Sequence, residues 1–248
     1  MEPIVTAFAL TLARVGTFIH ILPLLGGSNV PRSVKIGFSL ALSAMIFTNE
    51  ASTHVVAGLS SWVGFGVAMG REMILGSVLG FALSLFLLPA HVAAEFITQE
   101  AGLSFGSVLT GTGDGSASSL TAFFEMLAAL VFFELDLHHV FLLVLQETFQ
   151  YAPIGGGFQL PSWDLVTAVS AAEEGGVLLA APVALCLFVT TLVLALLTRA
   201  APQLNLYSVG FPVRVIVSLV ALLVLVPQLV SGMVSLFGYT MALLQMTR

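Results

Sequence analysis

Apolar residues occur in long continuous runs along this chain, separated by short stretches rich in glycine, proline and polar residues. We expect these runs to be helices, because the strands of a membrane barrel would instead alternate apolar and polar positions over about ten residues. A helix also satisfies its backbone hydrogen bonds internally, as an apolar environment requires. The runs lie at 4–25, 34–47, 62–88, 120–150 and 175–198, with the last between Arg214 and Arg248.

The runs are uneven in length. A simple membrane span needs about 20 apolar residues, which fits residues 175–198, whereas 34–47 is too short and 215–247 is too long. Pro89 predicts a kink or a break at the end of the third run, and Pro227 predicts a kink or a turn inside the last one. This unevenness indicates helices that pack within a protein assembly rather than helices that each cross lipid.

Composition narrows the class of protein. Only 8% of the residues are charged, whereas ordinary soluble domains have roughly 25%, and 58% are apolar. These values exclude a free soluble domain and a disordered chain. Seven basic residues and a net charge of −6 are too few cations for nucleic-acid binding. The single cysteine, Cys186, excludes a disulfide framework and a cysteine-rich metal site. A polytopic membrane protein, or a subunit buried among apolar partners, remains.

Basic residues give weak evidence on processing and topology. Residues 1–3 lack a basic n-region and Arg14 interrupts the next apolar stretch, so we expect the first run to belong to the mature protein. The positive-inside rule places two loops in the cytoplasm. The residues that flank these loops are Arg32 and Lys35 for the first, and Arg199 and Arg214 for the second.

Glycines and polar residues mark packing faces and loops. Gly66 with Gly70, and Gly76 with Gly80, are GxxxG pairs of the kind that let helix backbones approach closely. Three stretches are expected to be loops because they concentrate glycine, proline and serine. These loops are residues 103–119, 152–164 and 199–212.

Ionisable residues inside apolar runs are the clearest candidates for function, because they are costly there unless they are paired or face water. As one helix, the fourth run would place Glu125, Asp136 and His139 on one face, with Glu147 continuing the stripe. Such a face is compatible with a proton relay or cation path in a secondary transporter or ion channel. It is equally compatible with pairing to partner subunits, since few basic residues lie within the apolar runs.

Enzyme motifs are weak. Gly111–Asp114 matches the GxGD of intramembrane aspartyl proteases, but that chemistry needs a second aspartate, and neither Asp136 nor Asp164 follows a tyrosine. There is no HExxH, the adjacent histidines at 138 and 139 lack zinc spacing, and the glycine-rich loop has no lysine. We therefore expect no catalytic residue, no metal site and no cofactor.

Several ordered fragments resemble one family. They are PRSVKIG at 31–37, REMILGSVLGF at 71–81, AEFI at 94–97, AGLSF at 101–105, TF at 148–149, PIGG at 153–156, APQLN at 201–205 and VGFP at 209–212. Each fragment alone is weak, but together and in this order they resemble the FliR/SctT family of flagellar and type III export-gate proteins. The GFP ending at 210–212 favours the flagellar branch.

The resemblance implies an all-α membrane protein of about six apolar helices in hairpins, packed in a helical hetero-oligomeric export gate. Its expected partners are FliP-like and FliQ-like gate subunits, a FlhB-type protein, unfolded export substrates and the lipid membrane. The expected location is the bacterial inner membrane, as a multi-pass protein of the flagellar basal body. No enzymatic step belongs to such a subunit.

The resemblance also implies a division of the chain and a set of site residues. Residues 1–248 would form one FliR-like domain, with a FliP-like helical region at 1–150 and a FliQ-like hairpin at 165–248. A loop would plug the pore through Phe105, Gly106, Val108, Leu109, Gly111, Gly113 and Gly115. Polar contacts between subunits are expected at Arg71, Glu72, Glu95 and Glu125. A cytoplasmic loop would carry Arg199, Pro202, Gln203, Asn205, Phe211 and Pro212.

Overall fold

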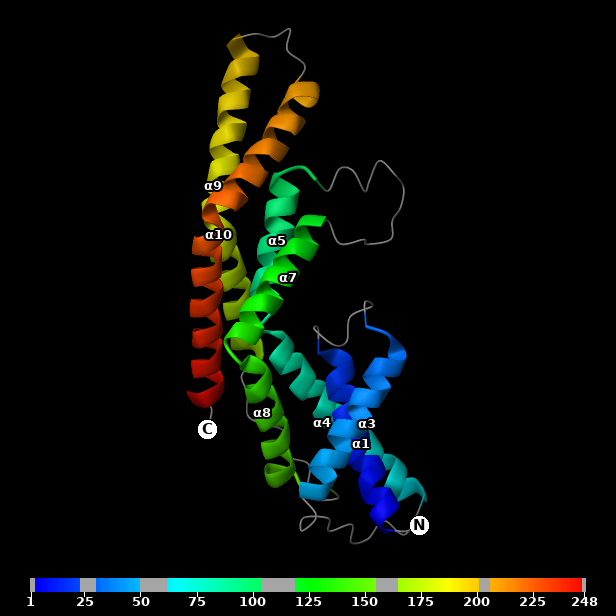
Figure 1. Cartoon of the computed structure of the whole chain (residues 1–248). Coiled ribbons are helices and arrows are strands. Elements are labelled where there is room, and N and C mark those ends of the chain that lie inside the picture. Colours follow the sequence, from blue (N-terminus) through cyan, green and yellow to red (C-terminus); the bar gives the residue numbers. More distant parts are fainter. Residues whose placement is uncertain are drawn as a thin grey trace. The chain divides into compact units, whose positions relative to one another are not determined.

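A computed structural model describes residues 3–22, 30–49, 62–103, 119–154, 165–200 and 206–246, and the regular elements within these ranges are all helices (Figure 1). The helices are α1 (Pro3–Ile21), α3 (Arg32–Asn49), α4 (Trp62–Ser84), α5 (Leu88–Glu100), α7 (Ser119–Glu134), α8 (Leu137–Tyr151), α9 (Leu165–Ala200) and α10 (Leu206–Met246).

Four of these helices, α1, α4, α9 and α10, are long and apolar enough to cross a membrane. A fifth span results if α7 and α8 are counted together. The predicted fold class, an all-α membrane protein, is confirmed.

The chain divides into two compact units, which differ from the predicted division near residue 150. The first unit contains residues 1–85 and 136–163, and the second contains residues 86–135 and 164–248. The predicted FliP-like and FliQ-like regions are not tested by this division and stay a prediction.

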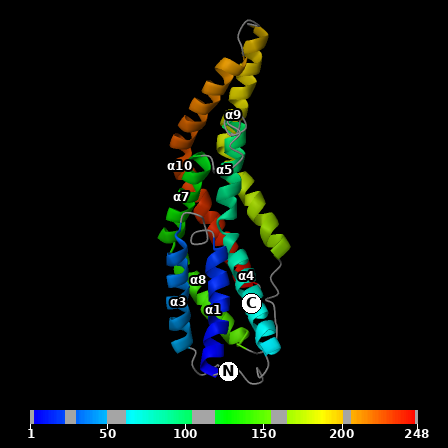
Figure 2. The ribbon, with the colours of Figure 1, turned by 90° about the vertical axis from the view of Figure 1, so that its right-hand side faces the viewer.

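In the first unit, α1 lies between α3 and α4 (Figure 2). Its buried apolar residues recur at helical spacing, which gives α1 contact surfaces toward both neighbours. These residues are Ala7, Leu10, Val15, Phe18, Ile19 and Leu22. The ring of Phe8 meets that of Phe47 on α3 edge-on, with centroids 5.6 Å apart.

In the second unit, α5 packs against α9 and α7, and α9 packs against α10 to form a helical hairpin (Figure 1). Half of the buried residues of α5 are alanines, at 90, 93 and 94, and the others are Pro89, Ile97 and Thr98. Gly176 of α9 meets α5 so closely that an added Cβ would lie 2.6 Å from the Cβ of Val92. Small residues on both helices therefore bring the two backbones together.

The two predictions made from prolines have different outcomes. The break predicted at Pro89 is confirmed, because α4 ends at Ser84 and α5 begins at Leu88, with Pro89 in its first turn. The turn considered at Pro227 is absent, since α10 continues through Pro227. The ribbon of α10 bends between its orange and red parts (Figure 1), as a proline inside a helix favours.

Three expected boundaries need correction. The fourth apolar run is two helices, because Leu135 and Asp136 interrupt it and Asp136 adopts a left-handed backbone conformation with φ 53°. Helix α9 begins ten residues earlier than expected and includes Pro182. Helix α10 begins at Leu206, so Phe211 and Pro212 are helical rather than part of a loop.

Candidate functional site

A buried arginine is the centre of a polar cluster in the first unit. Arg14 of α1 is fully buried, and its Nε donates to Oε2 of Glu72 on α4 at 2.6 Å. Its two terminal nitrogens donate to backbone carbonyls at the end of α8, Nη1 to Thr148 at 3.1 Å and Nη2 to Ala152 at 2.7 Å. The ring of Phe149 lies under the guanidinium, 4.2 Å from Cζ to the ring centroid.

This arrangement satisfies a charge that burial would otherwise make very unfavourable. A buried ion pair is stable only when further hydrogen bonds satisfy the remaining donors and acceptors. Here the planar guanidinium has a carboxylate, two carbonyls and an aromatic face around it, the combination of partners that arginine suits better than lysine. Arg14 therefore connects the end of α8 to both α1 and α4.

Arg71 completes the cluster from the same helix as Glu72. Its Nη2 donates to Oε1 of Glu72 at 2.9 Å and to the carbonyl of Pro153 at 3.1 Å. The Glu72 side chain is fully buried, and each of its two carboxylate oxygens is paired with an arginine of the same chain, Oε2 with Arg14 and Oε1 with Arg71. The structure places Arg71 and Glu72 in a cluster within the chain, and the contacts between subunits that the sequence analysis expected for them stay a prediction.

One of the two GxxxG pairs lies directly beside this cluster. A Cβ added at Gly76 would lie 2.2 Å from both the carbonyl oxygen of Arg14 and Oγ1 of Thr17. A Cβ at Gly80 would lie 3.0 Å from the carbonyl oxygen of Phe18. The close packing predicted for this pair is thus directed at α1 and keeps Arg14 within reach of Glu72.

Sequence reasoning missed the role of Arg14. It recognised Arg14 and Arg71 as the basic residues within apolar runs and treated them as too few to neutralise the acids. The available signal was an arginine in one predicted span and a glutamate in another, but 58 residues separate them, and no local spacing pattern covers such a distance.

In the second unit, the two glutamates predicted to contact partners are exposed. Glu95 lies on the exposed face of α5. Glu125 of α7 is 53% exposed and pairs with His91 of α5, with 3.2 Å between Oε1 and Nδ1. Since His91 and Glu95 are four residues apart, they share a face of α5 with which a partner could interact.

The acidic relay proposed from the fourth run loses its structural basis. That face required one continuous helix, but the helix ends at Glu134 and a new one begins at Leu137. Glu125 and Asp136 therefore do not belong to one helical stripe.

The other predicted site residues are only partly described. Residues 104–118, which hold all of the predicted pore plug, lie outside the described residues, as do Pro202, Gln203 and Asn205. Arg199 is in the last turn of α9, and Phe211 lies in α10. A Cβ added at Gly102, whose φ is +77°, would lie 3.5 Å from the ring of Phe211. This contact between the end of α5 and α10 was not expected.

The hairpin of α9 and α10 exposes unusually large apolar surfaces. Only 28% of the α9 span and 22% of the α10 span are buried within the chain. The exposed residues recur every three or four positions, so they form continuous faces that require an apolar neighbour. They include Leu185, Phe188, Leu192 and Leu196 on α9, and Ile216, Leu219, Leu223 and Val224 on α10.

Apolar helices, a buried ion-pair cluster and apolar faces that the described part of the chain leaves uncovered define a polytopic helical membrane protein built to pack against lipid or other subunits. The chain belongs to the family described as bacterial export proteins, family 1, whose model matches residues 5–240.

Relatives with known names agree with this assignment. The flagellar biosynthetic protein FliR of Buchnera aphidicola subsp. Acyrthosiphon pisum is 27% identical, over 90% of this chain and 86% of the relative. The flagellar biosynthetic protein FliR of Escherichia coli K12 is 30% identical, over 87% and 82%. A less similar relative is the surface presentation of antigens protein SpaR of Shigella flexneri, 25% identical over 81% and 77%. The resemblance to the FliR/SctT family predicted from the fragments is confirmed, and the flagellar branch is favoured.

Proposed function

We propose that this chain is a structural subunit of the flagellar type III protein export gate in the bacterial inner membrane. With FliP-like and FliQ-like subunits it forms the channel through which unfolded substrates cross that membrane. The observation that carries this proposal is the family match over residues 5–240. The names of its relatives, flagellar biosynthetic proteins in several bacteria, point to the same apparatus.

The distribution of apolar surface supports assembly with partners. Along α9 and α10 most of the apolar face is uncovered by this chain. The two helices contain 36 and 41 residues, about 54 and 62 Å at 1.5 Å per residue, whereas the hydrocarbon core of a bilayer is about 30 Å thick. Lipid alone cannot cover helices of this length, so other gate subunits are their natural neighbours.

The exposed polar residues of the second unit are the proposed contacts between subunits. Glu95 is exposed on α5, and Glu125 is 53% exposed on α7, where it pairs with His91. A FliP-like or FliQ-like neighbour with a basic or polar group at this position would satisfy both. Glutamine at both positions should lower the yield of the complex, whereas an unchanged yield would contradict this assignment.

The loop residues take the roles that the family resemblance implies. We propose that Phe105, Val108 and Leu109 help to close the pore, and that Gly106, Gly111, Gly113 and Gly115 let the loop yield to substrate. Deleting residues 106–115 should raise solute leakage through the assembled gate without preventing assembly. A deletion variant that assembles and stays as tight as the wild type would refute the plug.

The connection between α9 and α10 is proposed to face the cytoplasm near a FlhB-type protein. Arg199 lies in the last turn of α9. Pro202, Gln203 and Asn205 follow it in the sequence, before Phe211 and Pro212 in α10. A cysteine introduced at Ser208 tests this orientation. It should react with a membrane-impermeant reagent from the cytoplasmic side, and labelling only from the periplasm would overturn the proposal.

One purification decides between this function and the transporter alternative. The full chain, tagged and extracted from its native membranes in mild detergent, should carry two further small hydrophobic membrane proteins in fixed ratio, as mass spectrometry of the intact complex would show. A chain that purifies alone or only with copies of itself would instead support a transporter or channel.

A further inference from the structure

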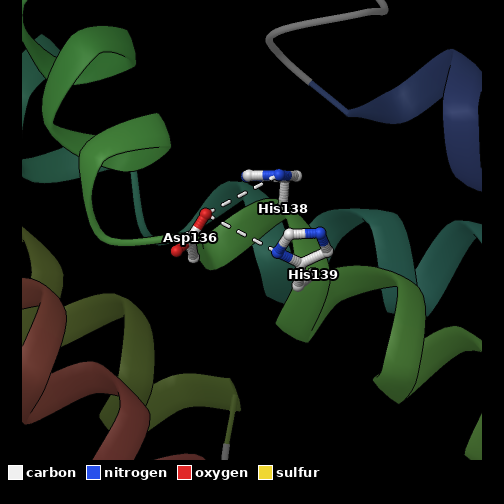
Figure 3. Close-up of side chains that lie close together, drawn as sticks. All are labelled: Asp136, His138 and His139. Atoms are coloured by element: carbon white, nitrogen blue, oxygen red, sulfur yellow. Dashed lines mark ion pairs between the residues drawn. The ribbon is translucent and has the colours of Figure 1, made fainter.

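Three metal-binding side chains come together where α8 begins (Figure 3). Asp136 is the residue before α8, and His138 and His139 are in its first turn. One ligand atom from each of the three lies within 4.8 Å of the other two. The sequence analysis rejected these histidines as zinc ligands because adjacent histidines do not match zinc-motif spacing. It grouped Asp136 with His139 only as part of an acidic stripe, not as a metal ligand.

The distances between these ligand atoms are close to the distances between ligand atoms around a bound metal ion. Oδ1 of Asp136 is 3.6 Å from Nδ1 of His139 and 3.9 Å from Nε2 of His138. In a tetrahedral zinc site with bonds of about 2.0–2.1 Å, neighbouring ligand atoms are roughly 3.3 Å apart. The two ligand–ligand distances would therefore have to shorten by only about 0.3 and 0.6 Å to reach that value.

The two imidazoles already face the same carboxylate oxygen. Their ring centroids are 4.2 Å apart and their planes are tilted by 36°. In Figure 3 a nitrogen of each ring points toward Asp136. The ring nitrogen nearest to the Asp136 carboxylate is Nε2 in His138 and Nδ1 in His139. Either imidazole nitrogen is a common metal ligand.

The backbone at Asp136 supports a specific role for its side chain. Among the described residues it is the only non-glycine residue with positive φ. That conformation is unfavourable for an ordinary L residue and is tolerated best by glycine, asparagine and aspartate. The Asp136 carboxylate makes no capping hydrogen bond to α8, so capping does not account for an aspartate here. The conformation turns the carboxylate toward the two histidines.

We propose that Asp136, His138 and His139 form a binding site for a divalent transition-metal ion. Two imidazoles and one carboxylate suit Zn²⁺, Ni²⁺ and Fe²⁺ rather than Mg²⁺ or Ca²⁺, which take oxygen ligands. Asp136 and His139 are largely exposed, at 73% and 67%, so the remaining positions are open to water or to a ligand from another molecule. A bound ion would tie Asp136 to the first turn of α8.

The test uses the full chain in detergent, purified through a tag without histidines so that the tag does not bind metal. Zn²⁺ is the probe, titrated in competition with a chromophoric chelator. The expected result is one site, lost on changing His138→Gln and His139→Gln together. Removing even an outer-sphere partner of a metal ligand lowers affinity about 10–100-fold, so loss of two ligands should exceed 100-fold.

Two further variants keep the result interpretable. Asp136→Asn retains tolerance for the left-handed backbone but removes the charge, and should weaken Zn²⁺ binding at least about tenfold. His91→Gln is the matched control, because His91 is an exposed histidine outside the cluster, and it should leave binding unchanged. His139→Gln alone alters an exposed side chain, so its effect is measurable even if the double variant unfolds.

The outcomes are distinct. Wild-type protein that does not take up Zn²⁺ in competition with the chelator, or variants at 136, 138 and 139 that bind as tightly as the wild type, would overturn the proposal. With Co²⁺ in place of Zn²⁺, the intensity of the visible absorption bands reports the coordination number. None of these measurements depends on whether the chain takes part in protein export.

Discussion

The two ends of α4 carry the same glycine spacing but meet different surroundings. At the second pair, a Cβ on Gly76 or Gly80 would collide with α1, whereas at the first pair, among the residues that the structure describes, a Cβ on Gly66 or Gly70 meets no heavy atom within 4 Å. The buried Glu72 lies between the two pairs. A GxxxG motif thus permits close approach, but the facing helix decides whether the approach occurs within the chain.

The two ends of α4 therefore have different structural roles. The end that carries Glu72, Gly76 and Gly80 holds the first unit together by packing and by charge. The end that carries Gly66 and Gly70 leaves a narrow face on which a helix of another subunit could pack closely. Substitutions at the Gly76 and Gly80 end of α4 should therefore have large effects on folding. Substitutions at the Gly66 and Gly70 end should have small effects on folding and larger effects on assembly.

The largest effect is expected from Glu72→Ala. It leaves Arg14 buried without its carboxylate, and removing one partner of a buried ion pair costs about 3–5 kcal/mol. Thermal unfolding of the purified chain in detergent measures the loss. Glu125→Ala is the control, because its pair with His91 is half exposed and such pairs are worth about 1 kcal/mol or less. Equal losses in the two variants would show that the Arg14 cluster does not stabilise the fold.

A double variant separates the contribution of charge from that of packing. Arg14→Met combined with Glu72→Met removes both charges and retains most of the volume, and replacing a buried ion pair by apolar groups is often neutral. Its unfolding temperature should lie between those of Glu72→Ala and the wild type. A double variant less stable than Glu72→Ala would mean that the carbonyls of Thr148 and Ala152 need the guanidinium.

Gly76→Ala should have the next largest effect. The added methyl group would lie 2.2 Å from a backbone oxygen and from Oγ1 of Thr17, itself bonded to the carbonyl of Ala13 at 2.8 Å. The backbone oxygen cannot move without shifting α1, and overpacking of this kind costs about 1–3 kcal/mol. Gly70→Ala is the matched control on the same helix. If the two variants unfold at the same temperature, the contact between α1 and α4 is looser than the structure shows.

Arg71→Gln should have a smaller effect. Glu72 keeps its contact with Arg14, whereas the bonds from Arg71 to Glu72 and to Pro153 are lost. Hydrogen bonds to charged groups contribute about 1.5–3 kcal/mol, and partial exposure lowers that value, so we expect a loss of about 1–2 kcal/mol. Lysine at the same position should restore part of it. Full restoration by lysine would show that charge alone, not the guanidinium geometry, matters at Arg71.

The smallest effect on folding is expected for Gly66→Ala and Gly70→Ala. Alanine is favoured over glycine inside a helix by about 0.5–1 kcal/mol each, so the isolated chain should become slightly more stable. If another subunit packs on this face, the same variants should lower the yield of the purified complex. A yield equal to that of the wild type would place the partner elsewhere.

Much of the fold follows from the sequence, but not all of its boundaries. Continuous apolar runs predicted helices, and Pro89 predicted the break before α5, because proline removes a backbone donor and clashes with the preceding turn. Pro182 and Pro212 show the limit of that rule, since both lie inside helices. In apolar surroundings neighbouring helices and local adjustments satisfy the freed carbonyls. The break at Asp136 has no glycine or proline, so pattern alone does not reveal it.

The candidate site was less predictable. The sequence shows that Arg14 and Glu72 are unusual in apolar helices, but which charge meets which depends on helix packing over distances that no periodicity encodes. Gly76 and Gly80 were correctly predicted to lie on a close-packed face, yet their partner, α1 of the same chain, is visible only in the structure. For Glu95 and Glu125, exposure agrees with a role at an interface, and that role stays a prediction.

The separation of Arg14 from its partners has a consequence for biogenesis. Synthesis proceeds at about 5–20 residues per second. Glu72 lies 58 positions after Arg14, so it is added about 3–12 seconds later. Until then α1 carries a lone arginine, and insertion experiments put the cost of arginine at the centre of a span at about 2.5–3.5 kcal/mol. The carbonyls of Thr148 and Ala152 are completed later still. We therefore expect stable integration of α1 to be delayed until the later helices that surround Arg14 have been made.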